Sequence, residues 1–152
     1  MTPHPRRDPA GHSHGHPEPA IAPFRPEAWD HAGTYLYGVD LYNHGYFWES
    51  HEIFEGLWNA FGHETTAGRL FKGLVQLAAA NLKRAEGFET ASRALGERGL
   101  AGVAGAPEGA FGLPVARLVE ETRAWFARRS DRFPVIALAM PFPGEPPPPP
   151  AR

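Results

Sequence analysis

The stretch that most constrains this fold is residues 43–58, because one helix must end and another must begin inside it. Gly45 can adopt the left-handed backbone conformation that closes a preceding helix, and Asn43 also tolerates that conformation. A new helix is predicted from about Tyr46 to Ala60, ahead of Gly62. The apolar residues of this helix recur at the spacing of one helical face: Phe47, Phe54, Leu57, Trp58 and Phe61. The stretch therefore predicts a helical hairpin whose second arm is amphipathic.

His51 is the polar member of this apolar face. Glu55 follows one turn later, within i,i+4 reach, whereas Glu52 lies beside Trp48 and Glu49 points mostly away. A buried imidazole needs a hydrogen-bond partner, because burying it alone is costly. Three interpretations remain open from the sequence: a structural His–Glu pair, a ligand or substrate site that also uses Glu52, and a metal site.

The metal interpretation depends on the pattern His-Glu-x-x-Glu over residues 51–55. The zincin motif has a second His in the fifth position, so that two imidazoles face one zinc ion. Here His51 and Glu55 could supply two ligands for a divalent metal, and a closed site needs a third or fourth ligand from elsewhere. No other predicted helix offers a Glu-x-x-His unit, which argues against a di-iron bundle.

Composition limits the classes of function that remain. The 152 residues suit one domain. Cysteine is absent, which excludes disulfides, thiol catalysis and Cys-type zinc sites and fits a reducing cytoplasm. The net charge of −2 implies no strong field for nucleic acid or an anionic membrane. No apolar run approaches the roughly 20 residues of a membrane span. We therefore expect a cytoplasmic protein that acts neither on membranes nor on nucleic acid.

Glycine and proline, with 17 residues each, concentrate at the two ends and in one internal loop. They divide the chain into a disordered His/Pro-rich tail over 1–25, a helical domain over 26–130 and an extended, Pro-rich tail over 131–152. In the first tail, His12, His14 and His16 alternate and could hold a divalent metal weakly.

Hydrophobic periodicity predicts an all-α domain, a compact bundle of four to five helices. The predicted helices cover about 26–42, 46–60, 67–86, 89–98 and 114–129, and residues 99–112 are predicted to form a flexible Gly/Ala loop. Gly73 and three neighbouring alanines would let another helix approach the third helix closely. If the second and third helices pack antiparallel, as a short loop favours, Arg69 and Gln76 could reach the carboxylates of the second helix. The apolar run 133–140 is expected to lie extended against the bundle.

At the central stretch the chain resembles the domain of unknown function 309 family, a group of small all-helical bacterial and plant proteins. The resemblance is carried by Leu41-Tyr-Asn-His-Gly45, Phe47-Trp-Glu-Ser-His-Glu-Ile-Phe-Glu55, Trp58 and Arg69-Leu-Phe-Lys-Gly-Leu-Val-Gln76. It covers about residues 27–98 and is weaker as far as Arg129. Trp48 departs from the family pattern, where Phe is more usual. The resemblance implies a bundle of several helices and no established activity, and its pattern points to Asn43, Gly45, Glu49, His51, Glu52, Glu55, Trp58, Arg69 and Gln76.

These observations predict a non-catalytic binding or interaction module with a polar cluster between the second and third helices. The predicted cluster comprises Asn43, Trp48, Glu49, His51, Glu52, Glu55, Trp58, Arg69 and Gln76. The alternative is a small metal-dependent hydrolase in which Glu52 or Glu55 acts as general base and His51 as metal ligand or proton shuttle. The partner is expected to be a protein or a small molecule, and a homodimer is compatible with the aromatic helix faces.

Overall fold

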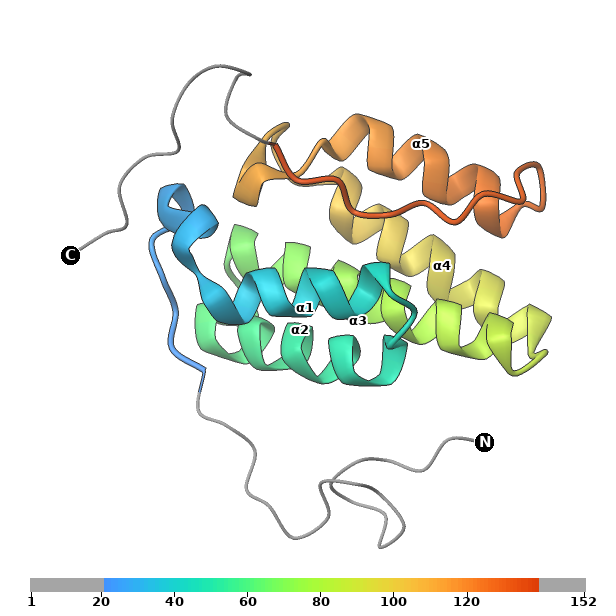
Figure 1. The fold of residues 1–152 in the computed structure, drawn as a ribbon, viewed down its shortest axis with the longest axis horizontal. Helices are drawn as coiled ribbons and strands as arrows, with labels where there is room; N and C mark the ends of the chain where they lie inside the picture. Colours follow the sequence, from blue (N-terminus) through green and yellow to red (C-terminus); the bar gives the residue numbers. More distant parts are fainter. Residues whose placement is uncertain (1–20, 140–152) are drawn as a thin grey trace, which may run out of the picture.

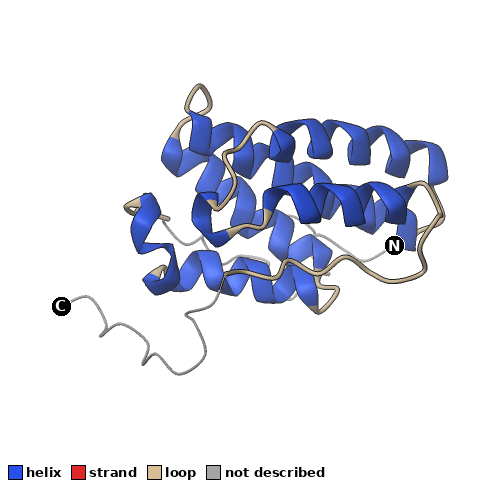
Figure 2. Ribbon diagram, turned by 90° about the horizontal axis from the view of Figure 1, so that it is seen from above, coloured by secondary structure: helices blue, strands red, loops and turns tan. Residues whose placement is uncertain are grey.

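The computed structural model describes residues 21–139, which contain five α-helices and two short 3-10 helices (Figure 1). The elements are η1 (Pro26–His31), α1 (Gly33–Asn43), α2 (Phe47–Phe61), α3 (Thr66–Ala85), α4 (Glu89–Ala104), η2 (Ala110–Gly112) and α5 (Val115–Phe126). The described residues contain no strand, as Figure 2 shows. The predicted all-α fold is confirmed. None of the described helices is long and apolar enough to cross a bilayer.

Local chemistry positions both ends of α2. Gly45 has a φ of 84°, and the N–H of Tyr46 donates to the carbonyl of Leu41 at 2.9 Å, which closes α1. Gly62, with a φ of 96°, ends α2, and its N–H donates to the carbonyl of Trp58 at 3.1 Å. The hydroxyl of Thr65 accepts a hydrogen bond from the N–H of Gly68 at 2.9 Å and caps α3. Because both connections are short, α1, α2 and α3 run alternately up and down.

All five α-helices contribute side chains to the core, which η2 and the extended segment around Ile136 close. Its largest fully buried side chains include Tyr35, Tyr42, Phe54, Phe71, Leu57, Leu74, Leu77 and Leu113. The hydroxyl of Tyr35 donates to the carbonyl of Phe111 at 2.7 Å. Burial raises the pKa of Tyr35 and of Tyr42 well above the ordinary tyrosine value, so both side chains are neutral hydrogen-bonding members of the core.

The predicted flexible loop over 99–112 is wrong in its first part, because α4 continues to Ala104. Here Gly99 and Gly102 lie against Gly73 of α3. A Cβ atom on Gly73 would lie 2.9 Å from the carbonyl oxygen of Gly99 and 2.9 Å from the backbone nitrogen of Val103. The glycines thus bring the two helix backbones into direct contact, and this packing offsets their weak helix propensity.

The predicted first helix, 26–42, is also interrupted. Ala32, with φ −85° and ψ 88°, separates the 3-10 turn η1 from α1. The packed region begins before residue 26, since the ring of Phe24 makes an edge contact with Phe61 at 5.1 Å and with Phe111 at 5.7 Å. The predicted His-rich metal site at His12, His14 and His16 lies outside the described residues, as does the Pro-rich run that begins at Pro141.

Residues 133–139 form an extended segment that we call the strap. In Figure 1 the strap, in red, runs alongside α5 and on the α1 side of the bundle. Ile136 is only 2% exposed, and the N–H of Ala139 donates to the carbonyl of Gly112 at 2.8 Å. The strap therefore closes the bundle on one side without forming a helix or a strand.

Candidate functional site

The buried side of α2 differs slightly from the predicted apolar face. Its fully buried residues are Ser50, Phe54 and Leu57, each 0% exposed, and the hydroxyl of Ser50 donates to the carbonyl of Phe47 at 3.2 Å. The side chain of His51 is 22% exposed and lies at the edge of the buried face. The prediction that His51 stands in the middle of that face is therefore wrong. A small, locally hydrogen-bonded serine occupies the centre instead.

His51 and Glu55 form the predicted i,i+4 pair. The Nε2 atom of His51 lies 3.6 Å from the Oε2 atom of Glu55, a separation longer than a hydrogen bond and typical of an ion pair when the imidazole is protonated. The ring of Trp48 stacks on the ring of His51, with centroids 5.4 Å apart and planes inclined by 20°. Aromatic stacking thus holds the imidazole on the outer side of α2.

Trp58 has a second stacked histidine, which the sequence did not predict. The ring centroids of Trp58 and His63 are 4.1 Å apart with an interplanar angle of 20°, and Nζ of Lys72 lies 5.6 Å from the Trp58 ring centroid. The Nε2 atom of His63 lies 2.8 Å from the Oδ1 atom of Asn59, which holds the imidazole in place. The signal in the sequence was the left-handed Gly62, which turns the chain so that His63 returns over the end of α2.

Trp48, His51, Glu55 and Trp58 follow one another at i+3 and i+4 spacing and therefore share one side of α2. This side flanks the buried row of Ser50, Phe54 and Leu57, and Trp58 is partly buried against the core. We call it the α2 outer face and define it as Trp48, His51, Glu52, Glu55, Trp58, His63 and Lys72. On α2 it contains His51, two indoles and two carboxylates. His63 of the following loop and Lys72 of α3 complete it.

Four predicted members of the polar cluster lie elsewhere. Asn43 forms hydrogen bonds with the backbone of Ile136 in the strap. Glu49 occupies another flank of α2, Arg69 is exposed and Gln76 is half-buried. In the described part of the chain, no hydrogen bond or ion pair joins Arg69 or Gln76 to the carboxylates of α2.

The predicted metal set consists of the pair His51 and Glu55. Residues 21–139 contain no group of three or more His, Asp or Glu side chains arranged to hold a metal ion. The pair offers one nitrogen and one oxygen donor from the same helix, which is half of the usual tetrahedral set of zinc.

A buried polar network between α3 and α5 was also missed. The side chain of Asn81, 2% exposed, accepts a hydrogen bond from Nε1 of Trp125 at 2.9 Å and donates to the hydroxyl of Tyr42 at 2.9 Å. The guanidinium of Arg84 covers the Trp125 ring at 3.6 Å and donates to its carbonyl at 2.7 Å. The signal was present, because Asn81 continues the row of Leu70, Leu74 and Leu77. A polar residue on such a row needs internal partners.

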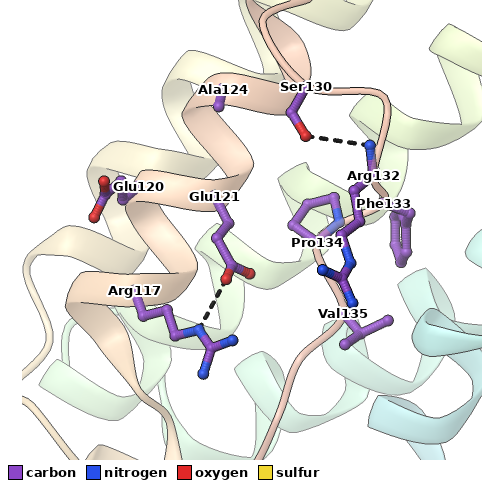
Figure 3. A pocket seen from close by; sticks show the side chains of 9 residues that line it. All are labelled: Arg117, Glu120, Glu121, Ala124, Ser130, Arg132, Phe133, Pro134 and Val135. Carbon is purple, nitrogen blue, oxygen red and sulfur yellow. Dashed lines mark hydrogen bonds and ion pairs between the residues drawn. The ribbon is translucent and has the colours of Figure 1, made fainter.

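A groove of about 460 Å³ lies on another side of the molecule, between α5 and the strap (Figure 3). Arg117 and Glu121 of α5 form a hydrogen-bonded ion pair at its wall, with Nε and Oε1 2.8 Å apart. Phe133, Pro134 and Val135 of the strap line the opposite wall. None of the predicted site residues lines this groove.

Comparison with known proteins defines the central part of the chain. Residues 35–95 match the model of the family described as Domain of unknown function (DUF309). This span begins in α1, includes α2 and α3, and ends within α4, so it contains the whole α2 outer face. The chain matches none of the curated proteins with which it was compared. The predicted resemblance to the domain of unknown function 309 family is thus confirmed over residues 35–95.

Proposed function

We propose that the domain is a non-catalytic binding module and that the α2 outer face contacts its partner. The observation that carries this proposal is the paired arrangement of indoles and imidazoles. Trp48 and Trp58 flank the His51–Glu55 pair, and each indole is stacked on a histidine. Tryptophan is enriched among the residues that dominate binding energy. Rings that are already held in place lose little conformational freedom on binding.

The charges on this face favour a cationic protein segment as the partner. Glu52 and Glu55 follow Trp48 by one and two turns of α2, so two carboxylates lie on the same face of the helix as its indole. A lysine or arginine from a partner could pair with a carboxylate and lie over an indole, and both interactions strengthen when water is excluded. The interface would then combine aromatic contacts with an ion pair in which this domain supplies the carboxylate and the partner supplies the cation.

The test compares capture of partners by the full chain with capture by single variants. Trp48→Ala and Trp58→Ala should each abolish capture of the specific partner. Tyr37→Ala and Phe88→Ala remove aromatic side chains that are 56% and 50% exposed on other elements, and they should leave capture unchanged. Urea unfolding of every variant establishes that the chain is folded. A captured protein that is lost equally from the Tyr37→Ala variant would contradict the proposal.

The second candidate is the metal-dependent hydrolase, which the 3.6 Å approach of His51 to Glu55 favours. In that function a metal held by this pair would activate water, and Glu52 would act as general base. The function needs a metal ligand beyond these two side chains.

Metal content distinguishes the two candidate functions, provided that the tail histidines are replaced so that they contribute no metal binding. The reference is the full chain with His12, His14 and His16 replaced by serine. Stoichiometric metal in this reference that disappears on adding His51→Ala would place the hydrolase first. Equal metal content in both variants would remove it, and a loss of stability in the folded His51→Ala variant would then measure the structural contribution of the His–Glu pair.

A further inference from the structure

Asn43 holds the strap in the manner of a peptide-binding residue. Its Nδ2 atom donates to the carbonyl of Ile136 at 2.9 Å, and its Oδ1 atom accepts from the N–H of Ile136 at 2.7 Å. One amide side chain therefore satisfies both backbone groups of one extended residue, as a neighbouring strand would. This contact recognises an extended backbone irrespective of the side chain that the backbone carries.

Two apolar sites next to Asn43 recognise side chains of the strap. The ring of Phe133 lies among the rings of Tyr42, Phe47 and Trp125, at centroid distances of 5.5, 5.6 and 5.6 Å. Ile136 is buried three residues later. The strap thus turns three side chains inward: Phe133, which is half-buried, and Pro134 and Ile136, which are buried.

The other side of the strap faces solvent. Val135 is 46% exposed and Ala137 is also exposed, so the side chains on either side of Ile136 contribute little to the contact. Tyr42, Asn43 and Phe47 all lie within the matched domain, residues 35–95, whereas the strap lies outside it. A folded domain here holds an extended segment from a distant part of the chain through its backbone and the side chains of Phe133, Pro134 and Ile136, which is how domains bind linear peptides.

We propose that the site formed by Tyr42, Asn43, Phe47 and Trp125 is a peptide-binding groove for extended segments of the pattern Phe-Pro-x-Ile. The strap occupies the groove in cis, and a partner protein that carries the same pattern replaces it. This inference goes beyond the α2 outer face, because it concerns the α1–α2 turn and α5. The groove beside α5, lined by Arg117 and Glu121, lies open next to the anchored segment and has room for side chains that flank such a partner.

The experiment measures binding of a fluorescent peptide of residues 131–139 by anisotropy. The first protein is the full chain with Phe133→Ser and Ile136→Ser, which vacates the groove. The peptide should bind this double variant at least roughly tenfold more tightly than wild type, because a tethered segment competes at high effective concentration. Adding Asn43→Ala should weaken binding roughly tenfold, through loss of two backbone hydrogen bonds.

Matched peptides test which side of the strap is recognised. A peptide with Val135→Ser should bind the double variant as the parent peptide does, whereas a peptide with Ile136→Ser should not bind. A folded double variant that fails to bind the parent peptide would overturn the proposal. Equal weakening by both serine substitutions would overturn it as well.

A second protein keeps the test decisive if the double variant does not fold. A specific protease site inserted between Arg129 and Ser130 leaves the groove and the strap unaltered, and cleavage turns the strap into a separate peptide. The cut strap should exchange with the labelled peptide in a protein whose mass by light scattering is the same before and after cleavage. Unfolding on cleavage, or a strap that never exchanges, would show that the segment is an integral part of the core. A dimer with exchanged straps that excludes the peptide would make a second copy the occupant. Each of these results overturns the proposal.

Discussion

The close contact between α3 and α4 makes Gly73→Ala the sharpest test of the packing argument. An alanine Cβ at position 73 would lie 2.9 Å from backbone atoms of both Gly99 and Val103, whereas ordinary van der Waals contact begins at 3.4 Å. These atoms belong to a helix backbone and cannot rotate away as a side chain can. The two helices would have to separate by about 0.5 Å at their closest point.

Two effects of opposite sign decide the free energy of unfolding of this variant. Alanine is favoured over glycine inside a helix by ~1 kcal/mol, which would stabilise α3. Forcing an extra carbon into a filled contact costs typically ~1–3 kcal/mol, and the upper end applies where backbone is displaced. The expected net result is a loss of ~1–2 kcal/mol.

The assay is urea unfolding followed by circular dichroism, with Gly33→Ala as the matched control. Gly33 is the first residue of α1, and a Cβ there meets nothing within 4 Å. The control should leave stability unchanged or raise it by less than about 1 kcal/mol. If Gly73→Ala proves as stable as Gly33→Ala, the contact between α3 and α4 has room for a side chain at position 73. The argument that this contact requires glycine is then refuted.

Three further predictions address buried and charged groups. Asn81→Leu should lower the free energy of unfolding by ~2–4 kcal/mol, because Tyr42 and Trp125 both lose a hydrogen bond. The control is Asn59→Leu, at an exposed position, whose urea unfolding should show little change. Arg128 donates to Glu89 and lowers the pKa of that carboxyl from 4.5 to about 2, so the stabilisation is complete above pH 4.5 and is lost as the pH falls toward 2. Unfolding curves should show that Glu89→Gln is less stable than wild type at neutral pH and equally stable at about pH 2. Burial raises the pKa of Tyr35 above its ordinary value, so the neutral hydroxyl stabilises the fold below about pH 10 and this contribution is lost at higher pH. Ultraviolet absorbance should show that Tyr35 ionises together with alkaline unfolding and not before it.

The sequence predicts helix ends well where a local signal is sufficient. The second helix was predicted over about 46–60 and occupies 47–61, and the third was predicted over 67–86 and occupies 66–85. Gly45, Gly62 and Thr65 mark these ends through left-handed backbone conformations and a side-chain cap. Such signals act within a few residues and require no knowledge of the tertiary fold.

Features that depend on distant partners could not be predicted. The helical conformation of residues 99–104 depends on Gly73, because glycines favour a loop unless another backbone packs against them. In the same way, the inward row that contains Asn81 was visible, but its partners in α1 and α5 were not. Periodicity identifies which side of a helix is buried, but it does not identify the element that packs against that side.

The contacts of the two asparagines bear on the choice of functional surface. Asn43 was predicted to join the polar cluster, yet its amide is engaged with the backbone of Ile136, and the amide of Asn81 is engaged with Tyr42 and Trp125. The amide of Asn81 joins α3 to α1 and α5, whereas the amide of Asn43 holds the strap, the segment that the proposed peptide replaces. His51, Glu55 and their neighbours instead flank the buried row of α2, and each of the two indoles there is stacked on a histidine. Trp58 also packs against the core, so it contributes to the fold as well as to the proposed contact. If the proposed function is correct, substitutions on the α2 outer face should reduce partner capture by more than their effect on stability explains.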